Sequence, residues 1–259
     1  MPDTILVDCA GQITTIRLNR PQVLNAVNPA MHLELQRAFD EFAADDSQRI
    51  CVITGAGSRA FCAGSDLEAG ARDQGFTYPK HGYAGLIERF DLNKPLIAAV
   101  NGVCLGGGFE IALACDLIVA CEGASFGLTE PRVGAIAVAG GVHRLVRHIG
   151  LKRAMGYLLT GARISPGEAW QLGLVNEVVP GDELQPAVDR WCQALLAAAP
   201  LAIEATKQLA LRGLDEADLA SALRHQRDYP AYQRWWNSED TREGVRAFAE
   251  KRAPVWRGK

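Results

Sequence analysis

The stretch from Pro95 to Asp116, PLIAAVNGVCLGGGFEIALACD, carries the residues best suited to chemistry. Two short apolar runs of strand length lead into the glycines Gly106–Gly108, and the residues after them, Phe109–Cys115, have the composition of a buried helix. Glycines at such a junction let a ligand approach the backbone closely. The first N–H groups of the helix have no intrahelical partner and lie at the positive end of its dipole. The junction is therefore predicted to bind negative charge.

Glu110 stands inside this predicted helix, among residues that are almost all apolar. Burial disfavours an ionised carboxyl group and raises its pKa. A carboxyl group beside backbone donors is typical of a general acid or base next to an oxyanion site. The alternative is a first-turn glutamate that the helix dipole favours. These residues alone leave both interpretations open.

The elements that must position this segment follow from the apolar pattern. Thr4–Cys9 and Ile13–Leu18 flank a turn and predict a β-hairpin, and Asn28-Pro29 predicts the start of a helix that runs to about Ala44. The other expected strands are Ile50–Thr54, Leu96–Val100, Val103–Leu105, Leu117–Cys121 and Leu174–Val179. The other expected helices are Gly85–Asp91, Val142–Ile149, Leu151–Leu159, the segment from Ser165 to Gly173, Glu183–Ala198, Pro200–Arg212, Glu216–Tyr229 and Glu239–Lys251. This order predicts an α/β core over roughly the first 180 residues, followed by a helical tail.

One motif match is interpreted as accidental. Gly55–Ala60, GAGSRA, fits the loose dinucleotide-binding pattern GxGxxG/A, but that pattern needs a helix to start within the glycines. Phe61–Leu67 follows instead, with another glycine and no helical period. The polar, glycine-rich stretch from Glu68 to about Tyr83 is predicted to be a loop, and loops of that length are usually functional or mobile.

Composition excludes several classes of function. At 259 residues the chain is long enough for a substantial core, and its formal net charge of −3, with no basic block, argues against nucleic-acid binding. No apolar run reaches the roughly 18 residues that span a membrane, and the N-terminus lacks the regions of a signal peptide. We therefore expect a cytoplasmic protein, or one in an organelle whose import sequence is absent.

Cysteine and histidine usage points to a reducing compartment and to no metal site. The seven cysteines are odd in number and include no CxxC, so they are interpreted as small buried hydrophobic residues. The five histidines are scattered, and His143 and His148 are five residues apart, which does not align them on one helix face.

Four stretches together resemble the crotonase superfamily, the enoyl-CoA hydratase/isomerase family. They are Leu18–Val27, Ala60–Leu67 (AFCAGSDL), Asn101–Asp116 and Gly127–Gly150, and their order and spacing match. The likeness covers essentially the whole chain. The ending NSEDTREGVRAFAEKRAPVW is similar to that of carnitinyl-CoA dehydratase-like members.

The resemblance implies an α/β fold, a crotonase-like spiral of ββα turns with a C-terminal helical trimerisation region. We expect the spiral core, with the oxyanion hole and the acyl-CoA site, in residues 1–197, and the trimerisation region in residues 198–259. The implied substrate is an acyl-CoA thioester, with coenzyme A as part of the substrate and no permanently bound cofactor. The implied assembly is a homotrimer or a dimer of trimers.

The resemblance also assigns residues to the site. The oxyanion hole consists of two backbone N–H groups, those of Ser65 and Gly107, and the serine hydroxyl is not expected to act as a nucleophile. The coenzyme A part of the substrate is expected to contact the backbone of Ala63, Ser65 and Leu67, and the tail residues Phe248 and Lys251 of a neighbouring subunit, with Lys251 near a phosphate.

Hydratases of this family resemble one another in having two glutamates, and Glu110 and Glu130 occupy both positions. One carboxyl group would accept a proton as water attacks the β-carbon, while the other would supply a proton to the α-carbon. A shared environment should push their pKa values apart. In isolation Glu130 would be interpreted as a solvated loop carboxylate, but its separation from Glu110 favours the catalytic interpretation. The acid and the base are not assigned.

The leading hypothesis is an enoyl-CoA hydratase-type lyase that adds water to a trans-2-enoyl-CoA or removes it from a 3-hydroxyacyl-CoA. The alternatives are an enoyl-CoA isomerase, for which one glutamate can suffice, a carnitinyl-CoA dehydratase, and a non-catalytic acyl-CoA-binding homologue. The run Gly134–Ala139 departs from the proline-containing run common in relatives. The acyl chain and the direction of the reaction therefore stay open.

Overall fold

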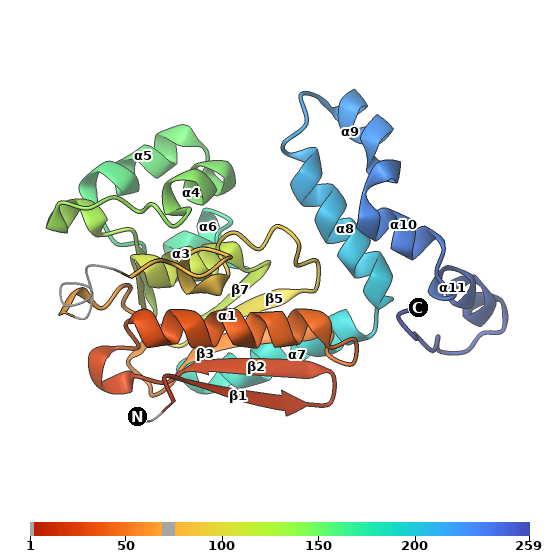
Figure 1. The fold of residues 1–259 in the computed structure, drawn as a ribbon, viewed down its shortest axis with the longest axis horizontal. Helices are drawn as coiled ribbons and strands as arrows, with labels where there is room; N and C mark the ends of the chain where they lie inside the picture. Colours follow the sequence, from red (N-terminus) through yellow and green to blue (C-terminus); the bar gives the residue numbers. More distant parts are fainter. Residues whose placement is uncertain (1–2, 69–75) are drawn as a thin grey trace. The chain divides into compact units, whose positions relative to one another are not determined.

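The structure is a computed structural model that describes residues 3–68 and 76–259 (Figure 1). These residues form two units. The first comprises Met1–Arg89 and Leu96–Asp189, and the second comprises Phe90–Pro95 and Arg190–Lys259. The expected boundary between a spiral core (residues 1–197) and a trimerisation region (residues 198–259) stays a prediction, because the packing of a single chain does not test which residues meet another subunit.

A six-stranded sheet forms the base of the first unit. Its strand order is β1-β2-β3-β5-β7-β9. The predicted hairpin is confirmed, since β1 (Ile5–Ala10) and β2 (Ile13–Leu18) pair antiparallel. The following strands are all parallel: β3 (Ile50–Gly55), β5 (Leu96–Val100), β7 (Leu117–Cys121) and β9 (Glu177–Val179). Every residue of β5 is buried, as is usual for a central parallel strand, whose sequence is then a continuous apolar run.

A second, three-stranded parallel sheet contains β4 (Ala60–Cys62), β6 (Val103–Leu105) and β8 (Ser125–Gly127). The chain passes from a strand of the large sheet to one of the small sheet three times, from β3 to β4, β5 to β6 and β7 to β8. This alternation is the predicted spiral of ββα turns. The GxGxxA segment leads into β4, so no helix begins within its glycines, and the dinucleotide-binding interpretation is excluded.

Helix α1 (Pro29–Ala44) confirms the predicted helix start, because the Asn28 side chain accepts a hydrogen bond from Met31 N at 2.9 Å. Its residues Phe39 and Phe42 belong to the buried core. The other helices are α3 (Gly107–Ala114), α4 (Gly141–Ile149), α5 (Leu151–Thr160), α6 (Pro166–Gln171), α7 (Leu184–Leu196), α8 (Pro200–Gly213), α9 (Leu219–His225), α10 (Pro230–Trp236) and α11 (Asp240–Ala249). In the described part of the chain, no single helix is long and apolar enough to cross a bilayer. The segments Gly181–Leu196 and Pro200–Gly213, which form a bent pair, have that length and composition only when taken together.

The helix expected over Gly85–Asp91 is wrong. The chain forms only a short 3-10 turn there, η2 (Tyr83–Gly85), because Gly82, Ala84 and Gly85 all have positive φ. Helix α10 lies in the tail that was expected to be helical, but between two of the expected helices, Glu216–Tyr229 and Glu239–Lys251. Part of the predicted loop from Glu68 to Tyr83 lies outside the described residues.

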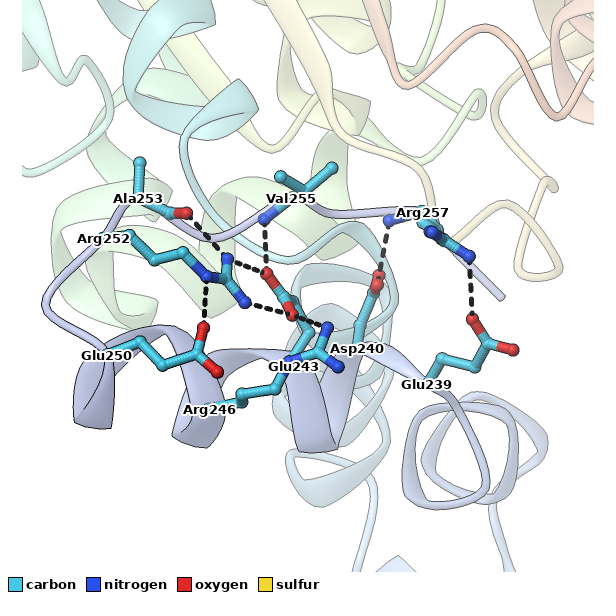
Figure 2. Close-up of polar contacts among 9 residues, drawn as sticks. All are labelled: Glu239, Asp240, Glu243, Arg246, Glu250, Arg252, Ala253, Val255 and Arg257. Carbon is cyan, nitrogen blue, oxygen red and sulfur yellow. Dashed lines mark hydrogen bonds and ion pairs between the residues drawn. The ribbon is translucent and has the colours of Figure 1, made fainter.

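The C-terminal segment folds back on helix α11 through two buried carboxylates (Figure 2). The Glu243 carboxylate accepts from Arg252 at 2.6 Å and from Val255 N at 2.9 Å. The Asp240 carboxylate accepts from the backbone N–H groups of Arg257 and Gly258, both at 2.8 Å. The hydrogen bond from Arg252, followed by those from Val255 N and Arg246, holds the pKa of Glu243 well below its usual range. The tail is therefore held by charge-assisted hydrogen bonds.

We predict that Glu243→Gln lowers the midpoint of the thermal transition of the C-terminal unit at pH 7. An unfolded glutamate takes up a proton near pH 4.3, whereas folded Glu243 stays ionised below that value. Its contribution is therefore complete above about pH 4.3 and is lost as the pH falls further. In calorimetric scans, the difference in melting midpoint between wild type and variant should therefore narrow as the pH falls from 7 to 3.

The matched control is Glu239→Gln. Glu239 lies 3.6 Å from Arg257, and both side chains are exposed, so this variant should melt like wild type. Equal melting of wild type and Glu243→Gln at pH 7 would contradict the prediction.

Candidate active site

Two neighbouring strands of the small sheet bring the glycine-containing segments that follow them, at Gly64 and Gly107, close together. β4 pairs with β6 in parallel, so the residues after their carboxyl ends lie side by side. A Cβ added to Gly64 would lie only 3.3 Å from Gly107 N and 3.0 Å from Leu105 O. The Gly64–Ser65 peptide is therefore placed beside the amide of Gly107, where helix α3 begins.

Neither the Ser65 N–H nor the Gly107 N–H donates a hydrogen bond to another residue in the described part of the chain. For Gly107 the reason is its position at the first turn of α3, where backbone N–H groups have no intrahelical acceptor. Two unpaired amides close together, one at the positive end of a helix dipole, form a site suited to an oxyanion.

A cavity of about 560 Å³ opens onto these amides, and residues of the first unit line it. Ser65 and Gly107 contribute backbone, while Glu110 and Glu130 contribute the two carboxyl groups. The side chains of Tyr78, Tyr83, Ile87, Ile136 and Val138 give the remaining wall an apolar and aromatic character. The cavity is of a size that suits a small organic group.

Glu110 projects from α3 and is only 3% exposed. Its Oε1 accepts a hydrogen bond from Gly141 N at 2.8 Å, at the start of α4. A Cβ on Gly141 would lie 2.9 Å from this oxygen, so the close contact requires glycine. Burial raises the pKa of Glu110 to about 7, and the Glu130 charge adds to the rise, while the bond from Gly141 and the Arg144 charge oppose it. At neutral pH the carboxyl group can thus both give and take a proton.

Glu130 begins the 3-10 turn η3 (Glu130–Val133) and lines the same cavity. Its Oε2 is buried and has no hydrogen-bond partner within residues 3–68 and 76–259. Burial raises the pKa of this group. A buried carboxyl oxygen without a partner is costly to the fold, and such groups are typical of sites that bind a ligand.

The cavity brings together six of the residues predicted from the sequence: Ala63, Ser65, Leu67, Gly107, Glu110 and Glu130. Phe248 and Lys251 do not line it. They lie in the C-terminal unit, on α11 and directly after it. Their contact with coenzyme A stays a prediction, since it was expected to involve a neighbouring subunit. Across the described ranges no group of three or more His, Cys, Asp or Glu side chains is arranged to hold a metal ion.

Sequence reasoning missed two features of the site. Gly141, which directly precedes the expected helix Val142–Ile149, was given no role, although it donates to Glu110. Tyr83 was placed at the end of a loop, and its burial in the cavity depends on a contact with α1 that no local pattern reveals. The glycines on both sides of Tyr83 were the only signal that could have indicated an unusual backbone there.

The chain is similar to known proteins in both sequence and structure. The sequence profile described as "Enoyl-CoA hydratase/isomerase" matches residues 8–259. Carnitinyl-CoA dehydratases of Proteus mirabilis (strain HI4320) and Salmonella typhi are 39% and 41% identical, each over 100% of both chains. An enoyl-CoA hydratase structure from Mycobacterium marinum superposes with a TM-score of 0.92 at 37% identity, and one from Mycobacterium tuberculosis H37Rv with 0.91 at 36%; each covers 99% of this chain and 100% of the other.

We predict that the ionisation of Glu110 costs stability at alkaline pH. Folded Glu110 keeps its proton to about pH 7, whereas the unfolded residue loses it near pH 4.5, so the wild type loses stability as the pH rises between these values. Glu110→Gln is never ionised and lacks this loss. The free energy of unfolding of the variant minus that of wild type should therefore be about 2–3 kcal/mol larger at pH 8.5 than at pH 5, because the wild type loses stability over this range.

Urea denaturation at both pH values measures the difference. The matched control is Glu41→Gln, which changes an exposed carboxylate on α1. A relative stability of Glu110→Gln that does not change with pH, or an equal pH effect in Glu41→Gln, would contradict the prediction.

Proposed function

Because this chain belongs to the enoyl-CoA hydratase/isomerase family, we propose that it adds water reversibly to a trans-2-enoyl-CoA, or removes it from the 3-hydroxyacyl-CoA. Its family and relatives make it a hydro-lyase that acts on coenzyme A thioesters. The observation that carries the proposal is the pair of carboxyl groups, buried Glu110 and half-buried Glu130, in one cavity beside two amides that donate to no acceptor in the described part of the chain.

The thioester carbonyl oxygen is proposed to accept from Ser65 N–H and Gly107 N–H. As water attacks the β-carbon, electron density moves onto this oxygen and an enolate develops. Amides fixed by the backbone need no reorganisation to stabilise that charge, and the dipole of α3 acts in the same sense. Losing one such donor typically costs on the order of 10²–10³ in rate.

The two glutamates are proposed to move the protons. One accepts a proton from the attacking water while the carbon–oxygen bond forms, and the other delivers a proton to the α-carbon as the enolate collapses. In dehydration the same steps run backwards. A pKa of about 7 for Glu110 keeps both of its protonation states accessible at neutral pH. The geometry does not assign one role to each residue.

Coenzyme A enters this reaction as part of the substrate, and the proposed chemistry uses no resident cofactor. The backbone of Ala63, Ser65 and Leu67 is proposed to contact its adenine or pantetheine part. Phe248 and Lys251 are proposed to reach the coenzyme A of a neighbouring subunit in a homotrimer or a dimer of trimers. The free, mostly buried cysteines suit a reducing compartment, and we place the enzyme in the cytoplasm.

A carnitinyl-CoA dehydratase is the second candidate. Full-length relatives at 39–41% identity carry that name. The substrate would be a 3-hydroxyacyl-CoA with a trimethylammonium group, and the aromatic rings of Tyr78 and Tyr83 in the cavity wall suit such a cation.

We predict that Glu110→Gln and Glu130→Gln each lower kcat for hydration of crotonyl-CoA by at least about 100-fold, because each removes one proton-transfer group. Glu41→Gln should keep wild-type kcat. Turnover in [18O]water, followed by mass spectrometry, should place the label in the 3-hydroxyacyl product.

An unlabelled product with a shifted double bond would instead identify an isomerase. A carnitinyl-CoA substrate that is turned over much faster than crotonyl-CoA would favour the second candidate. Coenzyme A binding without turnover of any thioester would favour the non-catalytic homologue.

We also predict that Lys251→Ala raises KM for crotonyl-CoA about 10-fold with little change in kcat, since a phosphate contact far from the reacting carbons stabilises ground state and transition state equally. Steady-state kinetics measure this split. Lys152→Ala, an exposed lysine on α5, is the control. An unchanged KM in Lys251→Ala would count against a role for the tail in coenzyme A binding.

A further inference from the structure

Tyr83 enters the cavity from a loop with an unusual backbone. Gly82, Ala84 and Gly85 have φ values of 71°, 55° and 61°, a region that alanine rarely adopts. Tyr83 itself is only 5% exposed. A strained conformation that is retained beside a cavity indicates that the position of the side chain matters for function.

Helix α1 holds this loop in place. Ala84 N–H donates to His32 Nδ1 at 2.9 Å, and the His32 ring meets the Tyr83 ring edge-on, with 4.5 Å between centroids. The acceptor role of Nδ1 requires a neutral imidazole. A Cβ added to Gly85 would overlap the backbone of Gln36, so the loop lies directly against α1. The strained backbone is therefore stabilised by a contact 52 residues away in the sequence.

The Tyr83 hydroxyl lies between the two residues of the oxyanion site. Ser65 Oγ donates to Tyr83 Oη at 3.1 Å. A Cβ added to Gly107 would overlap the same Oη, so the hydroxyl touches this glycine directly. Burial raises the pKa of Tyr83 well above its usual value, and the phenol stays protonated.

With Ser65 Oγ as the donor, the phenol hydrogen is not used in that bond, and because Tyr83 lines the cavity this hydrogen can turn toward a ligand there. A ligand oxygen in the cavity would supply an acceptor for this donor. The hydrogen bond from Ser65 also polarises the phenol and strengthens its donor. The ligand atom closest to both Ser65 and Gly107 in the proposed reaction is the thioester oxygen.

We infer that Tyr83 is a third hydrogen-bond donor at the oxyanion site, which stabilises the enolate oxygen together with the amides of Ser65 and Gly107, and that His32 is its positioning residue. The inference rests on the proposed function. It assigns a catalytic contact to a side chain on a separate loop, whereas the two amides belong to the sheet and to α3.

The test compares Tyr83→Phe with wild type in the hydration of crotonyl-CoA. Loss of a donor that acts mainly on the enolate should lower kcat by about 10- to 100-fold and leave KM within about twofold. The matched control is Tyr157→Phe, which removes a hydroxyl that donates to Glu168 on the surface of α5 and α6. An unchanged kcat in Tyr83→Phe, or a change confined to KM, would overturn the inference.

His32 is tested by two substitutions. Asparagine places an oxygen where Nδ1 lies, so His32→Asn should keep kcat within about threefold of wild type. His32→Leu lacks the acceptor and should reproduce the kcat loss of Tyr83→Phe, with no further loss in the double variant. Wild-type kcat in a folded His32→Leu variant would overturn the positioning role. If that variant does not fold, a kcat of His32→Asn as low as that of Tyr83→Phe would overturn it instead.

Binding of acetoacetyl-CoA separates this inference from the proposed function. This 3-ketoacyl thioester forms a stable enolate, so it probes the oxyanion site without turnover. If wild type hydrates no enoyl-CoA, the proposed function fails. The affinity for acetoacetyl-CoA, measured by titration calorimetry, then tests the role of Tyr83 independently. A roughly tenfold weaker affinity in Tyr83→Phe supports the third donor, and equal affinities overturn it.

Discussion

The close approach of two backbone segments, at Gly64 and Gly107, is the constraint on which the site depends. A side chain at Gly108 would overlap Cys62 O, and one at Gly64 would press on Leu105 O and Gly107 N. Parallel pairing of β4 with β6 imposes this distance, because it aligns the carboxyl ends of the two strands. The amide of Ser65, which follows β4, and that of Gly107, which begins α3, are therefore fixed by the backbone around them. Preorganisation of this kind is what distinguishes an oxyanion site from a loop that merely contains N–H groups.

The same region concentrates groups that a stable core would avoid. Glu110 is buried with one strong hydrogen bond, Glu130 has a buried oxygen without a partner in the described part of the chain, and Ala84 has a left-handed backbone. Each of these lowers the stability of the fold. The wholly buried strand β5 and the core around Phe39 offset the loss. Glu110 and Glu130 line one cavity, and Ala84 directly follows Tyr83, which lines it too. Such clustering is expected where function rather than packing has determined the residues.

Local patterns predicted much of the fold and only part of the site. The hairpin, α1 with its Asn28 cap and the order β5-β6-α3 follow from apolar runs, capping residues and glycines. Strands β4 and β8 were not among the expected strands; each has three residues, and each pairs with β6, which is distant in the sequence. Glu130 alone was indistinguishable from a loop carboxylate, and only the family resemblance connected it to Glu110. The conformation of Tyr83 could not be predicted, because His32 on α1 determines it.

The C-terminal unit holds helix α11 firmly and leaves apolar side chains of that helix exposed. Glu243 and Asp240 fix one side of α11 to the returning tail, so the helix and the turn at Lys251, where φ is 53°, are well braced (Figure 2). On the same helix Phe248 is 88% exposed and Val245 is 73% exposed, three residues earlier. Apolar side chains at this spacing share one helix face. Exposing such an apolar face to water costs free energy unless something covers it. This cost supports the proposal that the tail meets another subunit and its coenzyme A.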